Sequence, residues 1–171
     1  MINLHQIEKE ITQENLRTSK IITIALNLGV ALFAFVCFVL YLRGTEAASN
    51  ETEIIDILLI ILFILTSTIH GFSTLLPKRV LIKNLKQSEP NIIGAFNNYQ
   101  IMKLAMYEAP ALFGLVIIIL GITNESIYTN EYAFVAIAPM IAMFTFSLLN
   151  FPTEFKVKSF LKSVIEELEL K

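Results

Sequence analysis

Four long apolar segments constrain this chain more than any other feature of its sequence. They cover residues 21–42, 54–76, 104–122 and 132–151. Each is close to the ~20 helical residues that cross ~30 Å of hydrocarbon. Each is also apolar on all sides, whereas a spanning strand would show ~10 residues of alternating polarity. The segments therefore predict an all-α integral membrane protein with four spanning helices in a bundle.

The composition agrees with a single membrane domain over residues 1–171. Apolar residues make up 55% of the chain and charged residues only 16%, which lies outside the range of soluble domains. The net charge is −2, and lysines alternate with glutamates. Nucleic acid is therefore not an expected partner, because phosphate binding there needs a concentrated basic face. The expected partner is the lipid bilayer.

The distribution of positive charge predicts the orientation of the spans. Of the 13 Lys and Arg residues, three precede the first span, five lie between the second and third, and four follow the fourth. The other two loops contain only Arg43. Positively charged flanks stay in the cytoplasm. We therefore expect a protein of the cytoplasmic (inner) membrane with both termini on the cytoplasmic side.

The segments outside the spans are also expected to be helical. Residues 1–20 place Leu4, Ile7 and Ile11 on one face, which suits either an interfacial helix or a helix packed on its own bundle. Ser88 is a candidate cap for a helix that then runs unbroken into the third span. Residues 152–171 predict a tail helix, so the bundle would carry helical extensions in the cytoplasm.

Polar residues occur at a similar depth in all four spans. Asn27, His70 and Glu108 lie on the cytoplasmic side of the midplane in the first three spans, and Thr145 and Ser147 lie there in the fourth. A charge facing lipid at the membrane centre costs at least ~2.5 kcal/mol. These side chains are therefore expected to point into the bundle and find partners. The most specific expectation is a direct pair between His70 and Glu108.

Two prolines lie inside the predicted spans. Pro110 follows Glu108 by two residues, and Pro139 lies in the fourth span. Each proline lacks a backbone donor and crowds the preceding turn, so each predicts a helix kink. Three roles are open for the polar layer around Glu108. It can be a structural bond that fixes the bundle, a route for protons or ions, or a site for a small molecule or lipid headgroup.

The sequence supplies little for enzymatic chemistry. Cys37 is the only cysteine, and His5 and His70 are the only histidines, so a metal site is poorly supplied. No nucleotide-binding loop or nucleophile motif is present. We expect no cofactor and no enzymatic activity. The expected function is that of an accessory or scaffold subunit, and the alternative is a proton- or ion-translocating subunit that uses Glu108 with His70 in an oligomer.

The two halves of the chain resemble each other at an offset of 80 residues. ALNLGVALFAFVCFVL (25–40) aligns with AMYEAPALFGLVIIIL (105–120), and six of the sixteen positions are identical. This predicts two repeated helical hairpins related by an axis along the membrane normal. Convergent apolar composition explains the same matches equally well.

Three segments resemble a family of uncharacterised small four-span membrane proteins of Bacteroidota. They are ALNLGVALFAF, YQIMKLAMYEAPALFGLVIIILGITN with its Glu-x-Pro element, and FPTEFKVKSFLKSVIEELEL. This resemblance implies the four-span architecture and brings no activity with it. YEAPALFGLVIIIL is also similar to the ion-binding helix of the rotary ATPase proteolipid, which implies ion passage through Glu108. Unlike the proteolipid, this chain places its carboxylate on the first helix of a hairpin.

Overall fold

The computed structural model describes residues 4–44, 52–87 and 90–169, and over these ranges it contains helices and no strand. The all-α prediction is thus confirmed for the described part of the chain. In order, the elements are α1 (Leu4–Glu10), α2 (Arg17–Arg43), α3 (Thr52–Ser73), α4 (Leu75–Leu85), α5 (Ile92–Thr123), α6 (Ser126–Thr129), the 3₁₀ helix η1 (Glu131–Ile137), α7 (Ala138–Leu149) and α8 (Glu154–Glu169).

Four helical stretches are long and apolar enough to cross a membrane, as predicted. They are Arg17–Arg43, Glu53–Leu85, Ile92–Thr123 and Glu131–Leu149. The second and third extend well beyond their apolar segments, because α4 continues α3 past Thr74 and α5 already begins at Ile92. These extensions pack together as a helical hairpin, α4 against the start of α5.

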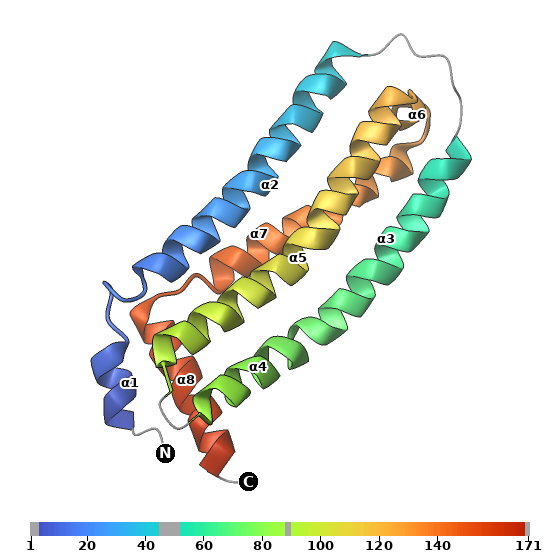
Figure 1. The fold of residues 1–171 in the computed structure, drawn as a ribbon. Coiled ribbons are helices and arrows are strands. Elements are labelled where there is room, and N and C mark those ends of the chain that lie inside the picture. Colours follow the sequence, from blue (N-terminus) through green and yellow to red (C-terminus); the bar gives the residue numbers. More distant parts are fainter. Residues whose placement is uncertain (1–3, 45–51, 88–89, 170–171) are drawn as a thin grey trace.

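Helix α5 is the hub of the fold. Figure 1 shows α2 and α3 on opposite sides of α5, and α5 packs against α2, α3, α4 and α7. Half of the most apolar stretch of α5 is buried, against 17% for the first span and 11% for the second. The outward faces of α2 and α3 are therefore apolar and exposed, as a lipid environment requires.

Helix α5 and η1 approach each other closely in the membrane core. A Cβ atom built on Gly114 would lie 2.1 Å from the carbonyl oxygen of Ala136. No side chain fits at that distance, so the contact requires glycine. Small residues allow helix backbones to approach closely in membranes, where packing replaces the hydrophobic effect as the main attraction between helices.

A second hydrophobic core lies at the end of the molecule that carries both termini (Figure 1). This core joins α1, α4, the first turns of α5, and helix α8. We call these four helical parts the platform. Its buried members include Ile7, Ile11, Leu81, Leu85, Ile92, Phe96, Val157 and Leu161. The N-terminal helix is expected to be either an interfacial helix or a helix packed on its own bundle. In the structure α1 packs on α8 and α5 of its own chain, which agrees with the second of these roles.

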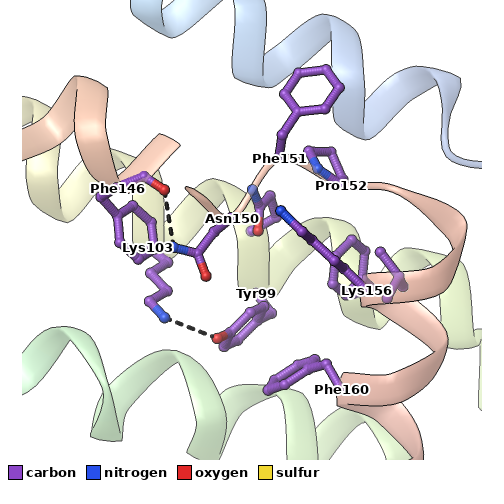
Figure 2. Close-up of a pocket in the computed structure, with 11 residues that line it drawn as sticks. Tyr99, Lys103, Phe146, Asn150, Phe151, Pro152, Lys156 and Phe160 are labelled. Carbon is purple, nitrogen blue, oxygen red and sulfur yellow. Dashed lines mark hydrogen bonds between the residues drawn. The ribbon is translucent and has the colours of Figure 1, made fainter. Parts of the chain in front are cut away.

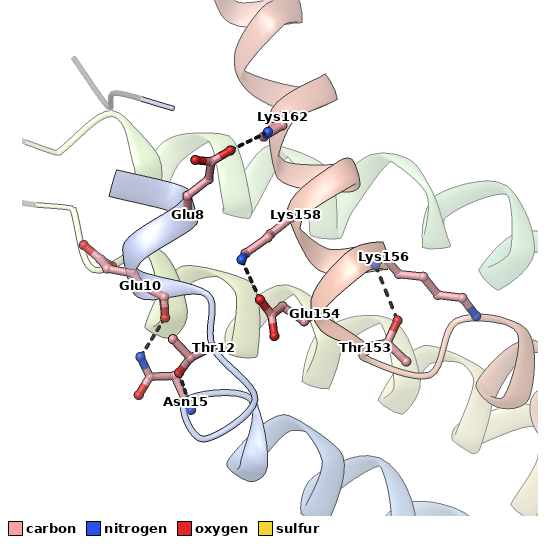
Figure 3. Close-up of polar contacts among 9 residues, drawn as sticks. All are labelled: Glu8, Glu10, Thr12, Asn15, Thr153, Glu154, Lys156, Lys158 and Lys162. Carbon is pink, nitrogen blue, oxygen red and sulfur yellow. Dashed lines mark hydrogen bonds and ion pairs between the residues drawn. The ribbon is translucent and has the colours of Figure 1, made fainter. Parts of the chain in front are cut away.

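Ion pairs tie the platform helices together at the surface. Lys162 Nζ lies 3.0 Å from Glu8 Oε1 and joins α8 to α1, while Lys158 pairs with Glu154 within α8 at 2.6 Å (Figure 3). Lys78 Nζ lies 2.5 Å from Glu167 Oε2 and joins α4 to α8. Exposed pairs of this kind contribute little each, so the apolar contacts beneath them provide most of the stability.

The capping and proline positions show how the spans begin and bend. Asn91 caps α5, since its Oδ1 accepts a hydrogen bond from Gly94 N at 2.7 Å. The predicted cap, Ser88, lies outside the described residues. Pro110 lies inside α5, which continues to Thr123. Pro139 stands in the first turn of α7 directly after η1, so the fourth span changes from 3₁₀ to α geometry at this proline.

Candidate functional site

One part of the predicted polar layer joins α2 to α7. Asn27 Nδ2 donates to Ser147 Oγ at 2.5 Å and to the Thr23 carbonyl oxygen at 2.6 Å. Asn27 Oδ1 is buried and has no hydrogen-bond partner among the described residues. Asn27 and Ser147, two polar residues of the predicted layer, are therefore joined by a hydrogen bond between two helices.

A second part joins α3, α5 and α7 through Tyr107. The His70 ring stands edge-on to the Tyr107 ring at 5.7 Å, and Ser73 Oγ lies 3.3 Å from Tyr107 Oη. On its other side, Tyr107 stacks on Phe146 with ring centroids 4.3 Å apart. The nearest aromatic contact of His70 is thus a tyrosine ring, an arrangement that orders the interface between the helices.

Glu108 lies half-buried on a different face of α5 from Tyr107. It follows Asn97 by three turns and precedes Leu115 by two, at about 3.6 residues per turn. Asn97 accepts a hydrogen bond from Ser19, and the Leu115 carbonyl accepts one from Cys37, so this is the face that meets α2. His70 is on α3, across the hub.

The structure therefore does not bring His70 and Glu108 together. None of the ion pairs or hydrogen bonds among the described residues joins them, and none involves the Glu108 carboxyl. The physical reason is helical geometry: consecutive residues point about 100° apart, so when Tyr107 takes the α3 side, Glu108 turns toward α2. The sequence predicted the depth of both groups but not their faces.

A separate cavity lies between α5, the end of α7 and α8. It measures about 90 Å³, and Figure 2 shows the residues that line it. Tyr99 and Lys103 are four apart on α5, as Lys156 and Phe160 are on α8, so each pair occupies one helix face. Tyr99 stacks on Phe160 at 4.8 Å and closes one wall. The turn from α7 to α8 contributes Asn150, Phe151 and Pro152.

Two lysines bring positive charge to this cavity. Lys103 Nζ donates to Tyr99 Oη at 3.2 Å and lies 4.7 Å from the centre of the Phe146 ring, within cation–π range. Lys156 Nζ donates to the Leu149 carbonyl oxygen at 2.6 Å. Neither ammonium takes part in an ion pair within the described ranges.

A buried amide completes the lining. Gln100 is only 4% exposed, and its Nε2 has no hydrogen-bond partner in the described part of the chain. A buried donor without an acceptor costs ~1–3 kcal/mol. The cavity thus combines two ammonium groups with an amide donor that lacks its acceptor, and no carboxylate lines it.

Sequence reasoning missed this cavity because its walls come from three elements that are distant in the chain. The only signal available was the fourfold spacing of Tyr99 with Lys103 and of Lys156 with Phe160. Among the described residues no cluster of three His, Cys, Asp or Glu side chains could hold a metal ion. Comparison with known proteins found no matching family model, no matching curated protein and no matching solved structure.

Proposed function

We propose that the protein is a non-enzymatic accessory or scaffold subunit whose spans hold the platform against one face of the inner membrane. The observation that supports this is the continuity of α5. Ile92 and Phe96 of this helix belong to the platform core, and Ala111 and Leu115 belong to the membrane core. Because one unbroken helix takes part in both cores, the platform keeps a fixed position relative to the spans.

The scaffold has apolar surface available for partners within the membrane. Phe63 on α3 is 74% exposed, and Phe35 on α2 is 61% exposed. These faces suit lipid, a second copy of the chain or other spanning subunits of a larger complex. We propose such an assembly as the setting in which the scaffold acts.

The platform is proposed to lie in the cytoplasm. Its helices share one core, so the three Lys- and Arg-rich segments of the chain gather at one end, which is the arrangement that positive-inside topology favours. In a Cys37→Ala background, a membrane-impermeant maleimide should label Glu131→Cys in intact cells. It should label Ser163→Cys only after the membrane is opened. The reverse pattern would overturn this orientation.

A second candidate function is proton or ion passage through Glu108, for which a His70 partner would have to come from a neighbouring copy of the chain. The observation that favours it is the Glu108 carboxyl itself, which lies in a spanning helix without a hydrogen bond or ion pair in the described part of the protein. A carboxyl in a span usually finds a partner or a water-filled path. In an oligomer, a neighbouring copy could provide either.

Glu108→Gln separates the two functions, with Glu131→Gln as a control that removes an exposed carboxyl. For a scaffold, native protein and Glu108→Gln should extract from membranes in the same complex, larger than one chain. Liposomes containing either protein should then be no more permeable to protons than empty ones. For translocation, the native protein and Glu131→Gln should carry a proton flux that Glu108→Gln abolishes. If the native protein is extracted as a single chain and its liposomes carry no proton flux, both functions are contradicted.

A further inference from the structure

We propose that the cavity between α5, α7 and α8 binds a phosphate-bearing anion. Its lining contains two ammonium groups, from Lys103 and Lys156, and no carboxylate that could neutralise them. Each lysine has three donor hydrogens, and the contacts described above use only some of them. Oxygen-rich anions accept several such donors at once, as phosphate groups do.

The lysines at this end of the molecule differ in their partners, and Lys9, Lys83 and Lys86 also have no ion pair within the described ranges. Lys158 and Lys162 lie on α8 close to Lys156 in sequence, yet both are paired with glutamates, and Lys78 is paired as well. The two cavity lysines instead contact a phenol, an aromatic face and a backbone carbonyl. Their charge lies beside a partly open cavity, with Lys156 exposed to solvent, and neither has a protein counter-ion in the described residues.

Gln100 provides the independent observation. This side chain lines the cavity, is 4% exposed and has an Nε2 donor without an acceptor in the described part of the chain. Burying such a donor is unfavourable unless an acceptor satisfies it. Gln100 lines the cavity, so a turn of its side chain toward the cavity would bring this donor to an anion seated between the lysines.

The size and level of the cavity limit what can bind there. At about 90 Å³ it is far smaller than the ~300 Å³ or more of pockets that enclose a whole drug-sized ligand. It therefore admits one phosphate group, with the remainder of any larger ligand outside. Lys103 directly precedes the third apolar segment and Phe151 ends the fourth, so the cavity lies at headgroup level. The phosphate could belong to a lipid headgroup or be free in solution.

The test uses the purified full-length protein in detergent, with phosphatidylglycerol, phosphatidylcholine and inorganic phosphate as probes in native mass spectrometry. Lys103→Gln and Lys156→Gln remove the two cavity charges, and Lys158→Gln and Lys162→Gln remove the same charge outside it. We expect the cavity variants to bind phosphatidylglycerol about fivefold more weakly, and the controls to bind it like the native protein. Thermal unfolding of every variant checks that each is folded.

Gln100→Glu is a second and nearly isosteric variant, and it should abolish binding because it places a carboxylate where the donor was. If phosphatidylglycerol binds and inorganic phosphate does not displace it, the ligand is a lipid headgroup. Binding of inorganic phosphate without the lipid identifies a soluble phosphate. The proposal is overturned if neither probe binds the native protein, if phosphatidylcholine binds equally well, if all four lysine variants lose the same affinity, or if Gln100→Glu binds like the native protein.

Discussion

Replacing Gly114 with alanine is expected to destabilise the membrane core by ~1–3 kcal/mol or more, the usual cost of overpacking. The added Cβ would lie 2.1 Å from the Ala136 carbonyl oxygen and 3.7 Å from Leu62 Cδ2. The first neighbour is a backbone atom, which cannot rotate away as a side chain can. Helix α5 and η1 must therefore move apart, and the contact that fixes the fourth span on the hub is lost.

Gly29→Ala is the matched control for this substitution. Gly29 also lies within a span, but a Cβ at this position would have no neighbour within 4 Å. Alanine is the better helix former by up to ~1 kcal/mol, so this variant should be as stable as the native protein or slightly more stable. Unfolding of both variants in detergent, followed by circular dichroism, measures the difference. Equal stability of the two variants would show that the close approach at Gly114 is not required.

The location of the spans could be predicted because it depends on length and composition alone. A run of about twenty apolar residues has few alternatives to a spanning helix. The extensions of α3 into α4 and of α5 back to Ile92 were harder to bound, since Lys78, Arg79 and Lys83 interrupt the apolar pattern without breaking the helix. There the periodic burial of Leu81 and Leu85 against the platform core keeps the chain helical.

Which helices touch could not be predicted from the same patterns. His70 contacts Tyr107, the residue next to Glu108, so the two groups lie at a similar level along α5, but the choice of face depends on packing that no local pattern specifies. The stack of Tyr107 on Phe146 and the close approach at Gly114 orient α5 and so direct Glu108 to α2. Depth follows from distance along a helix, whereas pairing depends on the rotation of each helix about its axis.

The internal repeat stays a prediction. Helices α2 and α5 run side by side, with Ser19 bonded to Asn97 and Cys37 to Leu115, so residues at an offset of 78 lie at the same level. This is close to the offset of 80 in the sequence alignment, as expected for parallel repeats. A repeated hairpin would pair α3 with α2, the other span of the first half of the chain. Helix α3 instead packs along α5, which belongs to the second half.

Replacing Leu161 with alanine is expected to have the largest effect in the platform. This residue of α8 is 0% exposed and lies in the core shared with α1, α4 and α5. If the platform is in water, as proposed, burial there is driven by the hydrophobic effect, and deleting a buried leucine costs ~2–5 kcal/mol. Helix α8 should therefore separate from the other platform helices, α1, α4 and the start of α5, while the spans stay helical.

Limited proteolysis of the protein in liposomes, with circular dichroism in parallel, measures this separation. Cleavage within 154–169 should become faster in Leu161→Ala, while most of the helical signal is retained. Phe155→Ala is the matched control, because it removes a large side chain from the same helix at a position that is 82% exposed. If the platform instead lay within lipid, Leu161→Ala would cost only the lost packing, so the difference in cleavage between the two variants would be smaller, because lipid provides no hydrophobic driving force between helices. The contrast between these variants therefore tests both the platform core and its place outside the bilayer.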